Sequence, residues 1–184
     1  MPARKKTPTS IFTIGHSTRP QEDFIGLLKS HGIQRVIDIR TIPRSRRHPQ
    51  FSREALASAL RAARISYLHI KKLGGLRRAK PNSKNLGWSN ASFRGFADYM
   101  QTAEFKTGIE RAAKLANTKA TALMCAEAVP WRCHRSLVAD ALLVRHFNVE
   151  HIVNGPRRQV HKLTKFAKVN GKQITYPTDG SALS

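Results

Sequence analysis

Hydrophobic positions along the chain fall into short apolar runs separated by amphipathic stretches. The runs are IFTIGH, RVIDIR, ISYLHI, ATALMCA and VEHIV, and their lengths and β-branched residues are typical of buried strands. Most of the stretches between them carry apolar residues on one helical face, as in the helix expected after Ser52. Strands alternating with helices predict an α/β fold, a single compact domain with a mainly parallel sheet, flanking helices and a Rossmann-like three-layer arrangement.

The segments outside this pattern set the expected boundaries. We expect a disordered basic tail over residues 1–9, the α/β domain over 10–155, and a basic, partly disordered extension over 156–184 with one weak helical stretch near VHKLTKFAK. A longer helical region is expected from the segment FRGFADYM to about Asn117, with a break at Gly108.

Charge adds an expectation about partners. The chain has 33 Lys and Arg residues against 11 Asp and Glu, a formal net charge of +22. Such an excess attracts polyanions, so we expect nucleic acid or a phosphorylated small molecule as the partner; solvated charge without a partner is the alternative. No stretch approaches the roughly 20 apolar residues of a membrane span, and no signal-peptide pattern is present. We therefore expect a cytoplasmic protein with no membrane partner and no structural disulfide.

Polar residues follow three predicted strands at their carboxyl ends. They are Gly15, His16 and Ser17 in the first, Asp38 and Arg40 in the second, and Cys125 to Glu127 in the fourth. Ligands of parallel sheets bind beyond these ends, so we expect the three groups to converge. Gly15 permits a sharp turn, and the amide groups that begin the next helix can hold an anion. The alternative is a helix cap at Ser17 or Thr18 with an internal pair between Asp38 and Arg40 or His16.

The stretch LMCAEAVPWRCHR contains both cysteines. Cys133 is expected at a helix N-terminus with cationic neighbours, which favours its thiolate, whereas Cys125 is expected to be an inert, packed thiol. Glu127 can move protons if burial raises its pKa, or else pair with Arg40 or Arg135.

A metal is the weaker alternative for the same stretch. Seven residues separate the cysteines, which is not the spacing of a zinc knuckle. A metal would need His16, Cys125, Cys133 and His134 to converge in space. No cofactor is expected.

Two arginine-rich loops are the last candidate feature. PRSRRHPQF and residues 71–90 combine cations with aromatic residues, which suits single-stranded nucleic acid. Residues 71–90 also lack any period, which in a compact domain indicates a functional or a disordered loop. The alternative is a solvated loop that one buried Trp88 anchors.

These observations give three sets of candidate residues. The candidate catalytic residues are Glu127, Cys133, His134, His16 and Asp38. The candidate anion-binding residues are Gly15, Ser17, Arg40, Arg44, Ser45 and Arg135. The candidate nucleic-acid contacts are Arg46, Arg47, Arg77, Arg78 and Trp88.

Several of these motifs, in this order, resemble those of the family called domain of unknown function 488. They are TIGHS, DIR..P.S, LGG, FRGFADYM and CAE…CHR, over about residues 11–152. The resemblance implies a compact α/β protein of bacteria or archaea and supplies no reaction. It carries over as motif positions Gly15, His16, Ser17, Asp38, Arg40, Pro43, Ser45, Gly74, Gly75, Cys125, Glu127, Cys133, His134 and Arg135. Ala128 follows the CAE glutamate where family members often have lysine, so a role for an amine there is not implied.

Three interpretations stay open from the sequence. The first is an enzyme-like polar site for an anionic substrate that bears phosphate or is nucleic acid, with the reaction unknown. The second is a nucleic-acid-binding module without chemistry of its own. The third is a metal or redox sensor built on the cysteine and histidine residues.

Overall fold

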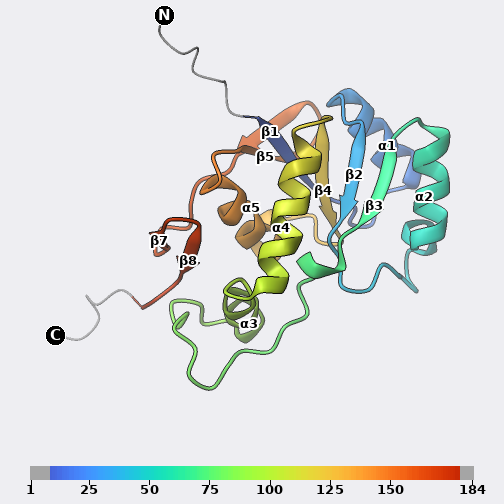
Figure 1. The fold of residues 1–184 in the computed structure, drawn as a ribbon. Coiled ribbons are helices and arrows are strands. Elements are labelled where there is room, and N and C mark those ends of the chain that lie inside the picture. The colour runs from blue at the N-terminus through green and yellow to red at the C-terminus, as the bar shows by residue number, and fades with distance from the viewer. Residues whose placement is uncertain (1–8, 179–184) are drawn as a thin grey trace, which may run out of the picture.

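A six-stranded sheet of order β3-β2-β4-β1-β5-β6 forms the centre of the molecule (Figure 1). This computed structural model describes residues 9–178. Residues 1–8 of the tail expected over 1–9, and residues 179–184 of the extension expected over 156–184, lie outside them. The strands are β1 (Ser10–Gly15), β2 (Arg35–Asp38), β3 (Ser66–His69), β4 (Thr121–Cys125), β5 (Asn148–Asn154) and β6 (Arg157–Val160), with a separate hairpin of β7 (Lys168–Asn170) and β8 (Gln173–Thr175). The helices are α1 (Gln21–Ser30), α2 (Arg53–Ala62), α3 (Ala91–Tyr99), α4 (Ala103–Ala116) and α5 (Arg135–Leu143), with short 3₁₀ turns η1 (Pro49–Phe51), η2 (Lys71–Leu73) and η3 (Pro130–Arg132). Within residues 9–178, no helix has the length and apolar character needed to cross a membrane.

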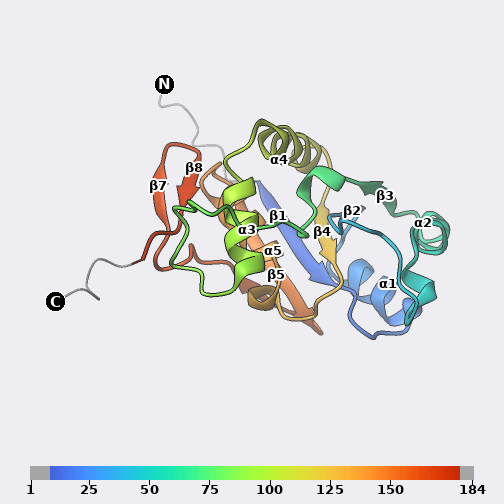
Figure 2. The ribbon, with the colours of Figure 1, turned by 90° about the horizontal axis from the view of Figure 1, so that it is seen from below.

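Helices cover both faces of the sheet. The neighbours from β3 to β5 all pair in parallel, and β6 adds one antiparallel strand beside β5. In β1, Phe12 and Ile14 pack with α1 and α2, whereas Ile11 packs with α4 and α5. Figure 2 shows α1 and α4 on opposite sides of the sheet. Burial on both faces explains why the strand sequences are continuous apolar runs. The predicted α/β fold with a mainly parallel sheet and flanking helices is confirmed.

The helical region predicted over residues 93–117 is two helices, and Gly108 is not the break between them. The Thr102 hydroxyl accepts a hydrogen bond from the Phe105 N–H and starts α4 as a separate helix. Gly108 lies buried inside α4, where an added Cβ would come within 2.9 Å of the Lys72 Cβ. Its small size therefore allows η2 to pack closely against α4.

The segment after residue 156 forms no helix, and side-chain contacts with α5 hold it against the domain. The weak helical stretch predicted near residues 160–168 is wrong, because no helix forms there. Both the N–H and the hydroxyl of Thr164 donate to the Asp140 carboxylate, at 3.2 and 2.7 Å. The His161 ring contacts the same carboxylate at 2.7 Å. The segment is thus held by hydrogen bonds to Asp140 of α5 instead of by the backbone hydrogen bonds of a local helix.

The contacts of Asp140 continue as a buried polar chain into the sheet. The His161 Nδ1 lies 3.0 Å from the His151 Nε2, and the His151 Nδ1 lies 2.6 Å from the Thr13 hydroxyl on β1. The Tyr176 hydroxyl donates to the other oxygen of Asp140 at 2.9 Å. One fully buried carboxylate thus links α5, β5, β1 and the segment after β8.

Residues 74–90 form a loop held in place by Asp98 of α3. Its carboxylate accepts hydrogen bonds from the N–H of Lys80, the hydroxyl of Ser83 and the side-chain amide of Asn85, at 2.6 to 2.8 Å. The Asn85 carbonyl oxygen in turn accepts from the Tyr176 N–H at 2.8 Å. The loop and the segment after β8 therefore pack side by side, as both views of the ribbon show (Figures 1 and 2).

Replacing Asp140 tests this architecture. In Asp140→Ala, four donor groups of His161, Thr164 and Tyr176 lose their acceptor, and we expect the free energy of unfolding to fall by about 3 kcal/mol. Tyr176→Phe removes one of these hydrogen bonds and should cost about 1 kcal/mol. Urea denaturation measures both values, and equal losses in the two variants would contradict the role of Asp140 as a hub.

Candidate functional site

A cavity of about 800 Å³ opens at the carboxyl edge of the sheet, toward which the arrowheads of β2 and β4 point in Figure 1. Its volume lies in the range of small-molecule sites. Three groups of lining residues follow the parallel strands: His16 to Thr18 after β1, Arg40 to Ile42 and Arg44 to His48 after β2, and Cys125 to Val129 at and after the end of β4. The other lining residues are Gly75, Leu76, Ser92 and Phe93 of the loop and α3, and Arg132 to His134 before α5. The three strand ends that carry the polar motifs thus meet at one cavity.

An ion pair between Asp38 and Arg40 lies beneath the cavity. The Arg40 Nε and Nη2 donate to the two carboxylate oxygens at 2.9 and 2.6 Å, and the Arg40 backbone N–H donates to one of them at 3.0 Å. The Tyr67 hydroxyl donates to the same carboxylate at 2.7 Å. Burial opposes the charge of Arg40, but the hydrogen bonds to Asp38 outweigh it and hold the pKa of Arg40 above its ordinary value. Asp38 is fully buried and does not line the cavity, so it orients Arg40.

His16 is fixed as a neutral ring. Its Nδ1 donates to the Ser17 carbonyl at 2.8 Å, which leaves Nε2 as the acceptor of the Arg40 Nη1 at 3.3 Å. The ring also stacks on Phe51, with centroids 4.2 Å apart. Burial lowers the pKa of His16 to about 4. Both ring nitrogens are therefore occupied by protein groups, and His16 holds Arg40 in position.

Both backbone amides after β1 have protein partners. The His16 N–H donates to the Cys125 carbonyl at 3.0 Å, and the Ser17 N–H donates to the Ala126 carbonyl at 2.8 Å. Helix α1 begins only at Gln21, which does not line the cavity. The His16 and Ser17 amides therefore connect the ends of β1 and β4, and the amides expected to hold an anion, those that begin the next helix, lie at the start of α1.

The two cysteines face each other at the cavity wall. Their sulfur atoms lie 2.7 Å apart, and both thiols are free and buried. The hydrogen bond between the two sulfurs, with help from the Arg135 charge, lowers the pKa of Cys125, and the same bond together with burial raises the pKa of Cys133. The directions of these two pKa shifts are opposite to the expectation from sequence, in which Cys133 was the favoured thiolate.

His134 joins the thiol pair to the end of β2. Its Nε2 donates to the Ile39 carbonyl at 3.2 Å, and its Nδ1 lies 3.5 Å from the Cys133 sulfur. Burial lowers the pKa of His134 to about 4, so the ring is neutral and its Nδ1 is an acceptor. An added Cβ at Gly75 would overlap this ring. The LGG motif therefore contacts the CHR motif directly.

Arg135 lies under the loop after β4. Only 1% of it is exposed, and its Nη2 donates to the Ala128 carbonyl at 3.2 Å. Its Nε and Nη1 are buried without a hydrogen-bond partner, and no ion pair forms with it among residues 9–178. An added Cβ at Gly15 would overlap the Glu127 carbonyl group and lie 2.9 Å from the Arg135 Nη1. Gly15 thus allows the loop and the guanidinium to approach β1.

The rim of the cavity is strongly cationic. Arg44, Arg46, Arg47 and Arg132 are exposed there, and Glu127 is the one carboxylate among the lining residues. Glu127 is exposed and has no ion pair within the described part of the chain, so neither of its expected pairs forms. The rim is open to solvent and able to attract anions.

The comparison with family models decides the relationship. The model of DUF488, a domain of unknown function, matches residues 20–142. The chain belongs to the DUF488 family. Comparison with curated proteins and with solved structures found no match. The matched region contains the DIR, LGG and CAE…CHR motifs, and in this DUF488 chain the three come together at the cavity.

The candidate residues of this DUF488 protein separate into two sets. The cavity is lined by His16, Ser17, Arg40, Arg44, Ser45, Arg46, Arg47, Glu127, Cys133 and His134. Gly15, Asp38, Arg77, Arg78, Trp88 and Arg135 do not line it. Arg77 lies over the Tyr99 ring at 3.5 Å and donates to the Gly74 carbonyl. Trp88 packs against Phe93, Phe166 and Tyr176, so it anchors the loop, as the alternative interpretation held.

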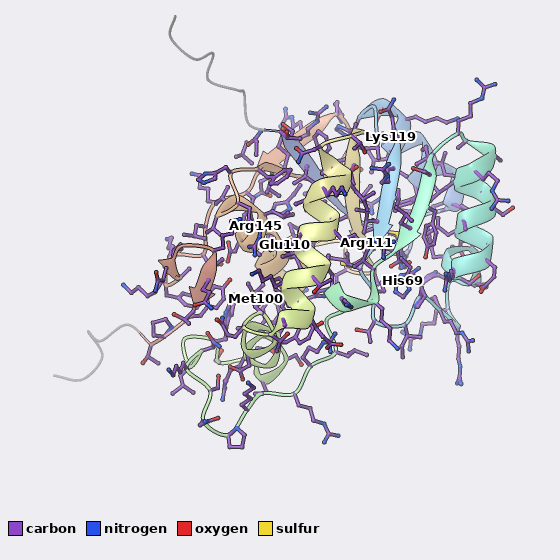
Figure 3. The ribbon with its side chains drawn as sticks, in the orientation of Figure 1. His69, Met100, Glu110, Arg111, Lys119 and Arg145 are labelled. Atoms are coloured by element: carbon purple, nitrogen blue, oxygen red, sulfur yellow. The ribbon has the colours of Figure 1, made fainter. Side chains whose placement is uncertain are left out.

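Some residues of the site escaped the reasoning from sequence. Phe51 is in none of the sets of candidate residues, yet its ring stacks on His16. Tyr67 and His69 were parts of a strand pattern, and they bind Asp38 and the Arg40 carbonyl at 2.7 and 2.8 Å. Figure 3 shows His69 at the end of β3. A polar residue in each alternate position of that strand was the available signal.

The residues that the structure describes do not form a metal-binding site with several shared ligands. No group of three or more His, Cys, Asp or Glu side chains is placed there to hold one ion.

The buried neutral histidines predict a pH dependence of stability. Burial lowers the pKa to about 4 for His16, about 4 for His134 and about 3 for His151. Between about pH 6.5 and pH 4 the unfolded chain binds protons that the folded protein does not, so acid lowers the free energy of unfolding by up to about 1.4 kcal/mol per histidine and pH unit. Urea denaturation across this interval measures the slope. His134→Gln should reduce it, whereas the exposed His146→Asn should not; equal stability at both ends would contradict the burial of neutral rings.

Substitution of two glycines tests the close approach of the Glu127 carbonyl to Gly15 at the end of β1. Gly15→Ala should lower the free energy of unfolding by about 1–3 kcal/mol, because its Cβ overlaps the Glu127 carbonyl. Gly26→Ala is the matched control, since Gly26 lies within α1 and has open space where a Cβ would be added. That change should stabilise the protein by about 0.5–1 kcal/mol. Thermal denaturation of both variants gives the comparison, and a neutral Gly15→Ala would refute the packing argument.

Proposed function

We propose that the cavity binds a phosphate-bearing ligand of nucleotide size, as an enzyme-like site at the carboxyl edge of the sheet. The observation that carries this proposal is the charge of the lining: five arginines against the single carboxylate of Glu127. Arg40 is paired with Asp38, but the other four arginines have no carboxylate partner within the described residues, and a phosphate-bearing ligand would supply that negative charge. Arginine also matches phosphate oxygens through paired N–H donors.

Arg40 is the best-prepared ligand contact in this proposal. Its guanidinium has five N–H donors, and three of them are used by Asp38 and His16. The remaining donors belong to a side chain that Asp38 and His16 hold rigid and that lines the cavity. A ligand therefore meets an oriented cation at the base of the cavity, with little side-chain entropy left to lose.

The apolar residues of the rim support a ligand with an organic part. Ile42 is 59% exposed and Leu76 is 72% exposed, and both line the cavity beside the arginines. Exposed aliphatic side chains of this size offer contact area to a base or sugar that a bare phosphate does not use. The combination favours a nucleotide-sized ligand over inorganic phosphate.

The proposed chemistry is proton transfer at the rim. Glu127 is solvent-exposed, lines the cavity and lies outside any ion pair of the described residues, so its carboxylate is free to face a bound ligand. His16 and His134 do not compete for this role, because their ring nitrogens contact protein groups.

Binding of ATP, compared with adenosine as its uncharged counterpart, tests the proposal by calorimetry. ATP should bind and adenosine should not. Arg46→Gln/Arg47→Gln should weaken ATP binding roughly tenfold or more, because two charge-assisted contacts are lost. The control Arg61→Gln/Arg111→Gln removes the same charge from exposed positions that do not line the cavity, and should leave binding nearly unchanged. Arg111 lies on α4 (Figure 3).

The two double variants distinguish attraction by the arginines of the cavity from attraction by the net charge of the whole protein. Absence of ATP binding would overturn the proposal. Equal weakening by both double variants would show that net charge alone attracts the ligand, which is the behaviour of a nucleic-acid-binding module whose affinity falls steeply with salt.

A further inference from the structure

The two sulfur atoms of the chain are placed for bond formation. Cys125 ends β4, Cys133 follows η3, and their Sγ atoms lie 2.7 Å apart. A disulfide bond is about 2.05 Å long, so the atoms need to approach by less than about 1 Å. Both residues line the cavity, which gives a small reactant a path to them. The chain contains no other cysteine.

The surroundings favour a negative charge on this pair. The guanidinium of Arg135 is buried, makes one side-chain hydrogen bond and has no carboxylate partner among residues 9–178. A buried cation without a counter-charge is costly, and a neighbouring thiolate relieves that cost. The Arg135 backbone N–H also donates to the Cys133 sulfur at 3.4 Å. Amide groups at the start of a helix stabilise thiolates in this way.

We propose that Cys125 and Cys133 form a reactive dithiol that reduces a small peroxide entering the cavity. This inference does not depend on phosphate binding. The peroxide is the fitting oxidant because the two cysteines are only 2% and 6% exposed, which excludes a bulky disulfide from direct attack.

The reaction has two steps. The Cys125 thiolate attacks one peroxide oxygen, the O–O bond breaks, and the leaving oxygen takes a proton to become water or an alcohol; Cys125 becomes a sulfenic acid. The Cys133 thiol then attacks the Cys125 sulfur, the S–O bond breaks, and the hydroxyl leaves as water with the thiol proton. The two sulfurs lose two electrons in total, and the peroxide gains them. A dithiol reductant restores both thiols.

Cys125 is the attacking residue in this scheme. The hydrogen bond between the two sulfurs and the charge of Arg135 favour its ionised form, so its pKa is lowered while that of Cys133 is raised. The second residue keeps its proton and is positioned to resolve the sulfenic acid.

Counting thiols in the wild-type protein is the first test. The reduced protein should show two thiols after denaturation, and protein treated with hydrogen peroxide should show none while staying monomeric on a non-reducing gel. The intact mass should fall by two hydrogen atoms, and dithiothreitol should restore both thiols. Retention of both thiols, disulfides only between molecules, or a mass gain of oxygen without disulfide would overturn the proposal. This test needs no variant, so it stands even where a substitution impairs folding.

A matched pair of variants assigns the two roles. In Cys133→Ser, Cys125 keeps a hydrogen-bond donor but has no resolving thiol, so peroxide should leave a sulfenic acid that dimedone traps. In Cys125→Ser, the remaining thiol should react more slowly, on the order of tenfold, since one pKa unit changes the thiolate fraction about tenfold. Alkylation rates near neutral pH measure this difference. Equal rates in the two variants would refute the assignment of Cys125 as the attacking thiol.

Continuous consumption of peroxide distinguishes a catalytic activity from a single oxidation of the two cysteines. With dithiothreitol present, the wild-type protein should consume hydrogen peroxide continuously, and each single-cysteine variant should consume much less. Consumption at the level of the variants would overturn the proposed reduction, and this result is independent of whether ATP binds to the cavity.

Discussion

The site depends on a buried ion pair that must be fully satisfied. Asp38 and Arg40 lie two residues apart at the end of β2, where the fold leaves almost no water to solvate them. Such a pair is stable only when further donors complete its hydrogen bonds. Tyr67 from β3 donates a hydrogen bond to the carboxylate, and His16, directly after β1, accepts one from the guanidinium. The demand for complete pairing therefore fixes the side chains of three strands at once.

The same edge is shaped by close backbone packing. Gly74 packs on Thr41, which follows the DIR motif, and Gly75 packs on the ring of His134. Gly15 packs on the loop that contains the CAE glutamate. The motifs of this DUF488 chain are thus mutual contacts, and several of their residues shape the cavity without facing a ligand. Five motif residues contact another motif residue and also line the cavity: His16, Arg40, Cys125, Cys133 and His134.

Much of the fold was predictable from the sequence because burial on both faces produces continuous apolar runs. The meeting of the strand ends follows from the parallel sheet in the same way. The site was harder to predict, because hydrogen-bond partners depend on which face each side chain takes. Arg77 and Trp88 are of residue types that often contact nucleic acid, yet Arg77 lies over the Tyr99 ring and Trp88 packs against aromatic rings of α3 and of the segment after β6.

Local pattern also failed where a distant partner decides the conformation. Residues 160–168 have a weak helical period, but Asp140 binds His161 and Thr164 and prevents the helix. The pairing of the cysteines is a similar case. Sequence shows that Cys133 precedes a helix, whereas only the tertiary structure shows that its sulfur lies 2.7 Å from that of Cys125.

The Asp140 hub has a consequence for the order of synthesis. Tyr176 leaves the ribosome 36 residues after Asp140, and the two meet in a buried hydrogen bond. Until Tyr176 emerges, the nascent chain carries a core carboxylate that lacks one of its donors, and Asn85 likewise waits for the Tyr176 N–H. Because domains fold as cooperative units during translation, the central sheet and the cavity edge reach their final stability only when this late segment docks.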